Sequence, residues 1–313
     1  MTQISIPSTL GLARERTHIH ARAADRGVTR HYRIGPVPVS LYSELPGIAH
    51  DFHRFYEPYQ VFAPAVDSFR IEVRPQRSWR SLRRYIHIRT NGREQCVLRS
   101  EKSVLPFVEW TMNALVARFL PGYLQIHAAT MSLDGQGVIL AGAPGQGKST
   151  LAAGLLARGW SYLSDEFALI HPDTRLLEPY PKALCIKSGS FAPLLKLGLP
   201  LDLDRVMHKG SKGPVSLLDP LAVRPDAVSS TCPVRMIVFP QYCPDAEPAV
   251  EGISRAQAVF ELVRASFNFT KFRGPGLEVL VETVRHARCV RVRSGDLNRT
   301  GELIEQALRG ETI

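Results

Sequence analysis

The sequence predicts an α/β fold built around a phosphate-binding loop, with a smaller α+β region ahead of it. The first observation is a glycine-rich motif at 142–149, which lies between an apolar strand pattern and a helical pattern. The second is a strand-turn-strand pattern at 127–141, directly before that motif. The third is the alternation in the first hundred residues, which is followed by one helical pattern. Together these patterns favour sheets covered by helices.

The first part of the chain divides into an arm and an α+β region. Residues 1–28 are polar, rich in Arg and Ala and weakly periodic, which predicts a flexible arm. Residues 29–122 form the predicted α+β region, with strands at 31–34, 69–73 and 85–89 and helices at 48–56 and 104–119. We expect Pro38 to limit the first strand, and Asn91-Gly92 predicts a hairpin turn.

Residues 123–313 form the predicted phosphate-loop domain, because strand and helix patterns now alternate. The patterns predict strands at 127–133, 138–141, 162–170, 183–187 and 236–239, and helices at 148–158, 254–266, 276–285 and 297–308. Asp134-Gly135 predicts a turn between the first two strands, and Asp296 is typical of a helix N-cap. The Pro-, Gly- and Ser-rich segment 209–233 predicts a mobile connection.

Composition excludes several classes of protein. With 313 residues, 44% hydrophobic and 22% charged, the chain predicts one or two globular domains and not a disordered chain. The five cysteines are scattered without metal-ligand spacing, which favours a reducing compartment over a disulfide scaffold or zinc site. We find no apolar run near the ~20 residues of a membrane span and no secretory signal pattern. We therefore expect a cytoplasmic protein without a membrane partner.

The net charge of +10 is concentrated in the first hundred residues, which hold 16 Arg, no Lys and 8 acidic residues (16 − 8 = +8). Nine of these arginines lie between Arg70 and Arg99, with Trp79 and Tyr85 among them. The stretch could attract phosphates or an acidic peptide, but a solvated arginine face is the favoured interpretation. A nucleic-acid partner is disfavoured, because the rest of the chain is nearly neutral and contains no recognisable nucleic-acid module.

The glycine-rich motif carries the strongest prediction. It matches the phosphate-loop pattern G-x-x-x-x-G-K-[ST] in full, and Thr150 follows it. The residues of the motif are Gly142, Ala143, Pro144, Gly145, Gln146, Gly147, Lys148 and Ser149. Glycines let backbone N–H groups surround phosphate oxygens, and the following helix contributes the positive end of its dipole. Lys148 can reach the outer phosphates, and the Ser149 hydroxyl can bind Mg2+. A chance match or an inactive loop is the alternative.

Two further features lie close to the motif in sequence. Asp165 and Glu166 follow one helix later, so a tight return would bring them beside the loop. Two carboxylates there could hold Mg2+ and accept a proton from a hydroxyl, and capping of a strand end is the alternative. His127, on the strand before the motif, could orient the acidic pair; a satisfied core histidine is the alternative.

The run from His127 to Glu166 resembles the HPr kinase/phosphorylase superfamily, whose P-loop fold is related to that of PEP carboxykinase. The stretches that carry the resemblance are closest to the HPr-kinase-related kinase A subgroup: 32–36, 124–129, 143–151, 158–166, 238–240 and 266–269. The resemblance covers about residues 32–309. The sequence departs from the bifunctional enzymes at Glu166, where they have Asp.

The resemblance implies roles for individual residues. Lys148 and Ser149 match the nucleotide and Mg2+ positions, Asp165 matches the catalytic base, and Glu166 matches the second acid, a further Mg2+ ligand. His127 matches the histidine that contacts the acidic pair. Two more lysines could bind the phosphate, with an ordinary surface lysine as the alternative in each case: Lys187 and Lys212.

The resemblance also implies an ATP-dependent kinase, in a homo-oligomer, that phosphorylates a serine hydroxyl of a small protein or peptide. Relatives of the subgroup include kinases that modify ribosomally made peptides such as lasso-peptide precursors, which favours a peptide substrate by analogy. Two other functions stay open from the residues alone. One is a nucleotide-dependent ATPase or switch protein, and the other is a small-molecule kinase on the same scaffold.

Overall fold

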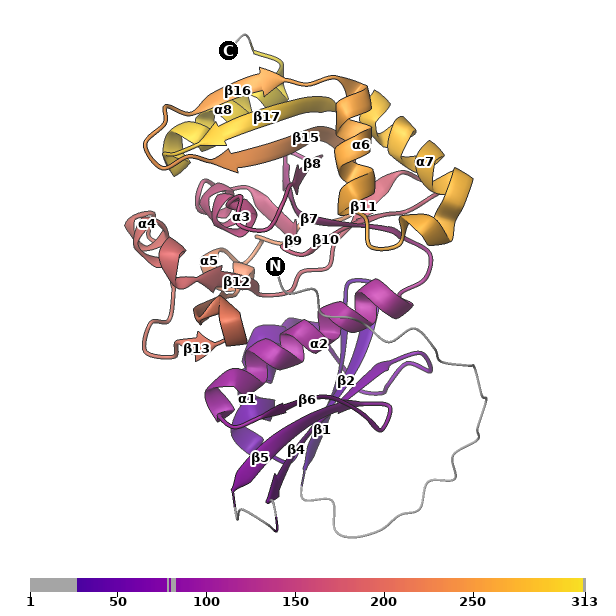
Figure 1. Ribbon diagram of the computed structural model, residues 1–313, viewed down its shortest axis with the longest axis vertical. Coiled ribbons are helices and arrows are strands. Elements are labelled where there is room, and N and C mark those ends of the chain that lie inside the picture. The colour runs from indigo at the N-terminus through magenta and orange to yellow at the C-terminus, as the bar shows by residue number, and fades with distance from the viewer. Residues whose placement is uncertain (1–26, 78, 80–82, 312–313) are drawn as a thin grey trace.

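The computed structural model describes residues 27–311, apart from 78 and 80–82. Almost all of the predicted arm therefore lies outside the described residues. Figure 1 shows a sheet built from the first hundred residues and a larger sheet built from later residues, with a long helix at 104–119 between them. Its buried side chains pack in one core with the N-terminal sheet and with Phe167 and Leu169 of the larger sheet.

The N-terminal sheet has six strands in the order β3-β1-β2-β4-β5-β6. Their bounds are β1 (Val28–Ile34), β2 (Val37–Ser43), β3 (Gln60–Val61), β4 (Phe69–Arg77), β5 (Arg84–Thr90) and β6 (Arg93–Leu98). Helices α1 (Pro46–Tyr56) and α2 (Val104–Phe119) pack on one face of it, with the short turns η1 (Glu57–Tyr59) and η2 (Glu101–Ser103). Alternate strand residues such as Val39, Ile71 and Ile88 are fully buried there.

The predicted strands, helices and hairpin turn of this region are confirmed, but β2 and the two-residue β3 were missed, and β6 was implied only by the hairpin turn. Pro38 does not limit the sheet: it lies inside β2, opposite Arg33 of β1. Strand β4 pairs with β2 only from Val39 onward. The missing N–H of Pro38 therefore removes no hydrogen bond between β2 and β4. Asn91 and Gly92 both have positive φ, as the hairpin between β5 and β6 requires.

The large sheet has the order β11-β10-β7-β8-β15-β17-β16, with β9 also paired to β7. Its strands are β7 (Leu124–Leu133), β8 (Gln136–Ala141), β9 (Ser161–Ser164), β10 (Phe167–Ile170), β11 (Leu176–Glu178), β15 (Cys232–Tyr242), β16 (Ala249–Gly252) and β17 (Arg288–Ser294). Strands β8, β15 and β17 run parallel to one another. Their carboxyl ends therefore meet at one edge, where ligands of open α/β sheets bind.

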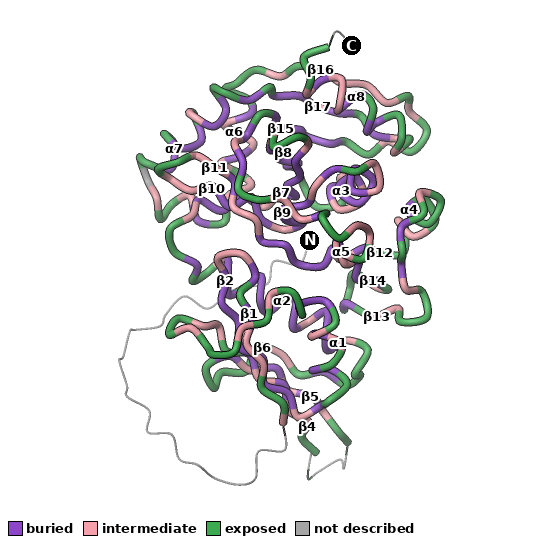
Figure 2. The backbone as a smooth tube through the Cα atoms, turned by 180° about the vertical axis from the view of Figure 1, so that it is seen from behind, coloured by how far each residue is buried: buried purple, intermediate pink, exposed green. Residues whose placement is uncertain are grey.

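Helices cover both faces of the large sheet. Helices α3 (Lys148–Ala157) and α8 (Leu297–Arg309) pack with Ala129 and Met131 of β7 in one core. Helices α6 (Arg255–Ala265) and α7 (Phe269–Arg285) pack with Ile126 and Ala128 in the core on the other side. Residues of β7 thus alternate between two apolar cores, and Figure 2 shows β8 and α3 deeply buried.

A small sheet lies beside α3, in the order β12-β14-β13. Its parts are β12 (Leu184–Lys187), η3 (Ser188–Ser190), α4 (Phe191–Lys196), β13 (Met207–His208), η4 (Gly210–Lys212), β14 (Pro214–Leu218) and α5 (Pro220–Val223). The segment 209–233, predicted as a mobile connection, therefore contains η4, β14 and α5 in its first half. Leu217 and Leu218 are buried, and Asp219 caps α5 through the Leu221 N–H. The prolines and glycines there mark element ends and not one long loop.

Two other predictions need correction. The strand expected at 162–170 is two strands, β9 and β10, separated by the acidic pair. The helix expected at 276–285 begins earlier, at Phe269, and contains Pro275. Phe269 and Phe272 pack against the α6–α7 core, so apolar burial extends the helix past the proline. The predicted N-cap of α8, Asp296, is confirmed, and Ser254, which was predicted as the first residue of a helix, is the N-cap of α6.

The N-terminal region and the rest of the chain share apolar packing. Phe167 and Leu169 of β10 and the buried Tyr180 belong to the same core cluster as α1 and α2. Ala168 and Ile170 of β10 instead face α6 and α7. The independence of region 29–122 as a domain stays a prediction. Its apolar core includes residues of β10, the strand next to β7.

Candidate functional site

Strand register brings the phosphate loop and the acidic pair to the same level of the sheet. Strand β7 pairs with β8 on one side and with β9 and β10 on the other. Ala128 of β7 lies opposite Ala141, the last residue of β8, and Thr130 lies opposite Ser164, the last residue of β9. Two strand spacings of about 4.8 Å separate these ends, so side chains that follow them can meet.

The break between β9 and β10 turns the acidic pair out of the ladder. The Ser164 hydroxyl accepts hydrogen bonds from the backbone N–H groups of Glu166 (3.3 Å) and Phe167 (3.1 Å). Beyond the break the pairing with β7 resumes, with Phe167 opposite His127. The Ser164 hydroxyl thus accepts the backbone N–H groups that would otherwise pair with a neighbouring strand. Asp165 and Glu166 are therefore free of the strand pairing and can face the loop.

The backbone of the phosphate loop is hydrogen-bonded to its own lysine, Lys148. The Lys148 ammonium donates hydrogen bonds to the carbonyl oxygens of Gly142 (2.6 Å) and Ala143 (3.3 Å). Gly145 and Gly147 have φ values of 92° and 81°, which side-chain-bearing residues rarely adopt. Lys148 begins α3, so the backbone N–H groups of its first turn are free of partners within the helix.

Most of the predicted site residues line one cavity of about 210 Å³. Those that line it are His127, Pro144, Gly145, Gly147, Lys148, Ser149, Thr150, Asp165, Glu166, Lys187 and Lys212. Gly142 and Ala143 contribute through their bonds to Lys148, and Gln146 lies in the loop without lining the cavity. The sequence analysis missed four lining residues: Cys185, Ile186, Ser190 and Lys209.

Asp165 has the electrostatics of a proton acceptor. Burial, with the nearby Glu166 charge, raises the pKa of its carboxyl to about 6, although the Ser149 hydroxyl, Lys182 and the Cys185 N–H oppose the rise. Its Oδ1 is buried and has no hydrogen-bond partner among the described residues. A carboxylate with a raised pKa and an unused acceptor oxygen suits general base chemistry near neutral pH.

His127 and Glu166 also line the cavity, beside Asp165. The His127 Nδ1 lies 3.6 Å from the Glu166 Oε1, and its ring meets the Phe267 ring edge-on at 5.5 Å. Burial lowers the pKa of His127, while the Glu166 carboxylate opposes that effect and Lys148 adds to it. Burial likewise lowers the pKa of Lys148, and both carboxylates of the acidic pair oppose it.

The segment at 266–269 braces the strand that carries His127. The Asn268 side chain accepts the Gln125 N–H (2.9 Å) and donates to the Tyr123 carbonyl (2.9 Å), while Phe267 N–H donates to the Gln125 carbonyl (2.9 Å). Asn268 is buried, and its amide satisfies backbone groups at the start of β7. Its place in a Ser-Phe-Asn-Phe run was the sequence signal for this role.

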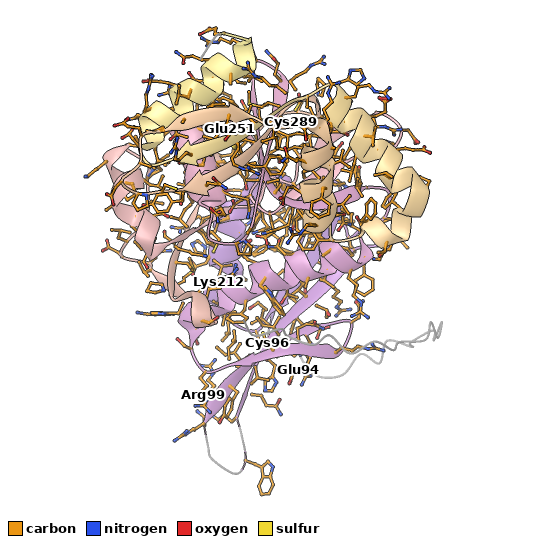
Figure 3. The ribbon with its side chains drawn as sticks, turned by 45° about the horizontal axis from the view of Figure 1, so that its top comes forward. Glu94, Cys96, Arg99, Lys212, Glu251 and Cys289 are labelled. Atoms are coloured by element: carbon orange, nitrogen blue, oxygen red, sulfur yellow. The ribbon has the colours of Figure 1, made fainter. Side chains whose placement is uncertain are left out.

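Three lysines from the small sheet and its turn also line the cavity, and they are called the lysine wall below. Lys187 ends β12, Lys212 lies in η4, and Lys209 precedes η4 with its Nζ 3.6 Å from the Cys185 sulfur. Lys209 is buried, and its presence in the run His-Lys-Gly-Ser-Lys could have drawn attention to it. Figure 3 shows Lys212 near the boundary between the two parts of the molecule.

Helix α2 supports this lysine wall from the N-terminal region. A Cβ placed on Gly210 of η4 would lie 3.6 Å from the Phe107 ring of α2. The turn that carries Lys209 and Lys212 therefore lies against α2.

A buried charge network, which the sequence analysis missed, also connects the two parts. The Lys182 ammonium and the Tyr56 hydroxyl both donate to the Glu109 carboxylate. Burial lowers the pKa of Lys182, but the Glu109 charge outweighs burial and leaves that pKa raised. Glu109 interrupts the apolar pattern of α2 at a buried position, and this was the available signal.

The arginine-rich stretch forms β4, β5 and β6, and several of its side chains pair with acids. Arg74 donates to Glu44 (2.6 Å), and Arg70 lies 3.2 Å from Glu72. Residues 70–99 contribute nothing to the cavity lining found among the described residues. These pairings agree with a solvated arginine face.

Three other observations bear on the predicted classes. Across the described residues, no helix is long and apolar enough to cross a membrane. All five cysteines are free thiols. The described residues also contain no cluster of three or more His, Cys, Asp and Glu side chains arranged to hold a metal ion.

The fold and the cavity together define a mixed α/β protein in which a glycine-rich loop faces two carboxylates and several lysines. The model of one protein family, described as SynChlorMet cassette protein ScmC, matches residues 97–184. That segment includes the loop, His127, the acidic pair and Lys182, and it ends before Lys187. No curated protein is similar enough to match the chain.

Among solved structures, the chain is similar to the Hpr(Ser) kinase/phosphatase from Coxiella burnetii. The sequence identity is 13%, the match covers 59% of this chain and 97% of that one, and the TM-score is 0.28.

Proposed function

We propose that this protein is a kinase that transfers the γ-phosphate of ATP to a serine hydroxyl of a small protein or ribosomally made peptide. The observation that carries the proposal is the single cavity in which the phosphate loop faces both Asp165 and the lysine wall. A site that only held a nucleotide would need the loop, whereas a buried carboxylate with a free acceptor oxygen adds a proton acceptor beside it.

The loop and the first turn of α3 hold the phosphates. Backbone N–H groups of the loop and of the first turn of α3, such as those of Gly147 and Ser149, bind the β- and γ-phosphate oxygens together with the Lys148 ammonium. To do so the ammonium exchanges its bonds to Gly142 and Ala143 for phosphate oxygens. Because charge on the transferred group is spread over its oxygens, several fixed cations stabilise the transfer: Lys148, Lys187, Lys209 and Lys212.

Asp165 acts as the base. The substrate hydroxyl oxygen forms a bond to the γ-phosphorus, the bond from that phosphorus to the β,γ-bridging oxygen breaks, and ADP leaves. The hydroxyl proton passes to the Asp165 carboxylate, whose pKa of about 6 leaves it ionised but basic at neutral pH. His127 contacts Glu166 and so keeps the second carboxylate in place beside the base.

Ser149 and Glu166 are the residues that would hold Mg2+. Their hydroxyl and carboxylate oxygens are ligands that Mg2+ accepts, and both line the cavity beside the phosphate loop. When bound, the ion neutralises charge on the phosphates. Two protein ligands suffice for this purpose, because Mg2+ in such sites keeps waters and phosphate oxygens as its other ligands.

The acceptor class rests on the resemblance noted in the sequence and on the cavity's open lysine wall. A peptide serine is the preferred acceptor, and a small metabolite or water are the competing ones. The cytoplasmic location and the homo-oligomeric state stay predictions.

The test is mass spectrometry of reactions that contain γ-labelled ATP, Mg2+ and peptides encoded next to the gene. We expect label on a peptide serine with the wild-type chain and none with Lys148→Ala. Lys196→Ala is the matched control, because Lys196 is an exposed lysine of α4 outside the cavity.

Other outcomes identify the competing functions. Labelled free phosphate with unmodified peptides would make the protein an ATPase or switch. Label on an added metabolite would make it a small-molecule kinase. Asp165→Asn that folds and transfers phosphate at the wild-type rate would refute the assignment of the base.

A further inference from the structure

An exposed aromatic side chain lies beside the phosphate loop, on the side away from the acidic pair. Tyr242 is the last residue of β15, and its side chain is 55% exposed. A Cβ placed on Gly147 would lie 3.6 Å from the Tyr242 Cβ. The base of the tyrosine side chain therefore lies beside the loop backbone at Gly147.

The order of strands fixes the direction in which a bound nucleotide must run. The acidic pair follows β9, which lies on the β7 side of the loop-bearing strand β8. Strand β15 lies on the opposite side of β8, in parallel register with it through Val238 and Leu140. The reacting phosphate faces the acidic pair, so the nucleoside end extends toward the carboxyl ends of β15 and β17, which lie together in Figure 1.

The backbone around Tyr242 is held in place. Tyr242 pairs with Ser294 of β17, and the next residue, Cys243, donates its N–H to the Ser294 carbonyl (2.9 Å). A Cβ on Gly295 would lie 2.5 Å from the Ala246 carbonyl oxygen, so the loop after β15 packs closely on the turn after β17. The tyrosine ring therefore projects from a fixed base, which lowers the entropy cost of stacking on it.

We propose that the Tyr242 ring is the stacking platform for the base of the bound nucleoside triphosphate. This inference rests on the proposed function, because it needs phosphates in the loop. The π-face of a tyrosine stacks on purine and pyrimidine bases alike, and such contacts contribute measurably to nucleotide affinity. The tyrosine belongs to the binding of the nucleoside and takes no part in the transfer.

The test compares two ligands that share phosphates but differ in the base. Isothermal titration calorimetry with Mg2+ measures the affinity of the full chain for ATP and for inorganic tripolyphosphate. We expect Tyr242→Ala to weaken ATP binding about tenfold and to leave tripolyphosphate binding unchanged. Tyr242→Phe retains the ring and should restore most of the ATP affinity. Phe260→Ala, which removes another exposed ring, on α6, is the matched control and should change neither affinity.

The other outcomes overturn the inference in distinguishable ways. Wild-type ATP affinity in Tyr242→Ala would show that the ring does not contact the base. An equal loss for ATP and tripolyphosphate would show that Tyr242 only supports the loop. If the wild-type chain bound neither ligand, the proposed function would fail first and this inference with it.

Discussion

The two walls of the cavity are built in different ways. The wall with the phosphate loop and the acidic pair comes from one stretch, 142–166, with His127 shortly before it. The lysine wall comes from Lys187 at the end of β12 and from Lys209 and Lys212 around η4, and it rests against α2 of the N-terminal region. The first wall holds its geometry through the register of β7, and the second depends on contacts between distant parts of the chain.

The difference indicates that the two walls have different roles. Groups that must be placed relative to one another, the loop and the base, lie on adjacent strands of one sheet, where register fixes them. Groups that only supply positive charge lie on a small sheet and a turn. We therefore expect substitutions in the first wall to affect the reaction most strongly, and substitutions beneath the second to affect stability.

The largest expected effect is on phosphate transfer in Lys148→Met. Removal of a fixed cation from the phosphates should slow transfer about 100- to 1,000-fold, since such groups stabilise charge that develops in the transition state. Initial rates with labelled ATP measure this effect. A variant with more than a tenth of the wild-type rate would mean that the lysine wall supplies the charge instead.

The next effect is on stability in Glu109→Gln. This substitution leaves the buried Lys182 without its counter-charge, and loss of one partner of a buried pair costs about 3–5 kcal/mol. Urea unfolding measures the change in free energy. Glu101→Gln is the matched control, because Glu101 is exposed and pairs with Arg84 at 3.7 Å, so it should cost less than about 1 kcal/mol. Equal losses in both variants would show that the network does not join the two parts.

A stability gain is expected in Asp165→Asn without nucleotide or Mg2+. Asp165 has a pKa of about 6 in the folded chain against 3.8 as its ordinary value, so the folded state binds its proton more tightly than the unfolded state does. Wild-type stability should therefore fall as pH rises from about 4 to 6, and by pH 7.5 the carboxylate costs roughly 3 kcal/mol at most.

Thermal and urea unfolding of Asp165→Asn and wild type at pH 5 and pH 7.5 check this prediction. The gain in the variant should be larger at pH 7.5 than at pH 5. Glu166→Gln is the matched control in the same wall, and we expect a smaller gain from it because its side chain is 31% exposed. A gain in Asp165→Asn that does not change with pH would contradict the raised pKa as its cause.

The smallest effect is expected from the lysine wall. Lys209→Ala should weaken ATP binding about tenfold, because it removes one of several cations around the phosphates. Titration calorimetry with Mg2+ and ATP measures the change, and Lys196→Ala provides a lysine variant outside the cavity. Loss as large as that of Lys148→Met would remove the distinction between the two walls.

Local patterns determined much of the fold. The helical spacing in 104–119 predicted α2 with its observed bounds, and the motif at 142–149 predicted a loop between β8 and α3. Asp134-Gly135 and Asn91-Gly92 predicted their hairpins. These features depend on neighbouring residues, so the sequence contains their full cause.

The features that were missed depend on distant partners. Strand β2 contains a proline that is tolerated because of where β4 begins to pair. Helix α7 continues through Pro275 because Phe269 and Phe272 pack against the apolar core between α6, α7 and the large sheet. Neither the break after Ser164 nor the strand and helix inside 209–233 could be seen in local periodicity, since packing outweighs local preference there.

By itself, the sequence determined which residues could bind phosphates and accept a proton, because glycine, lysine and carboxylate chemistry follows from residue type and spacing. Only the tertiary structure decided which cations and which aromatic ring surround them. Lys209 and Tyr242 reach the loop from strands and turns more than 60 residues away (209 − 148 = 61). The physical reason is that backbone pairing between distant strands, and packing of the small sheet on α2, have no signature in the local sequence.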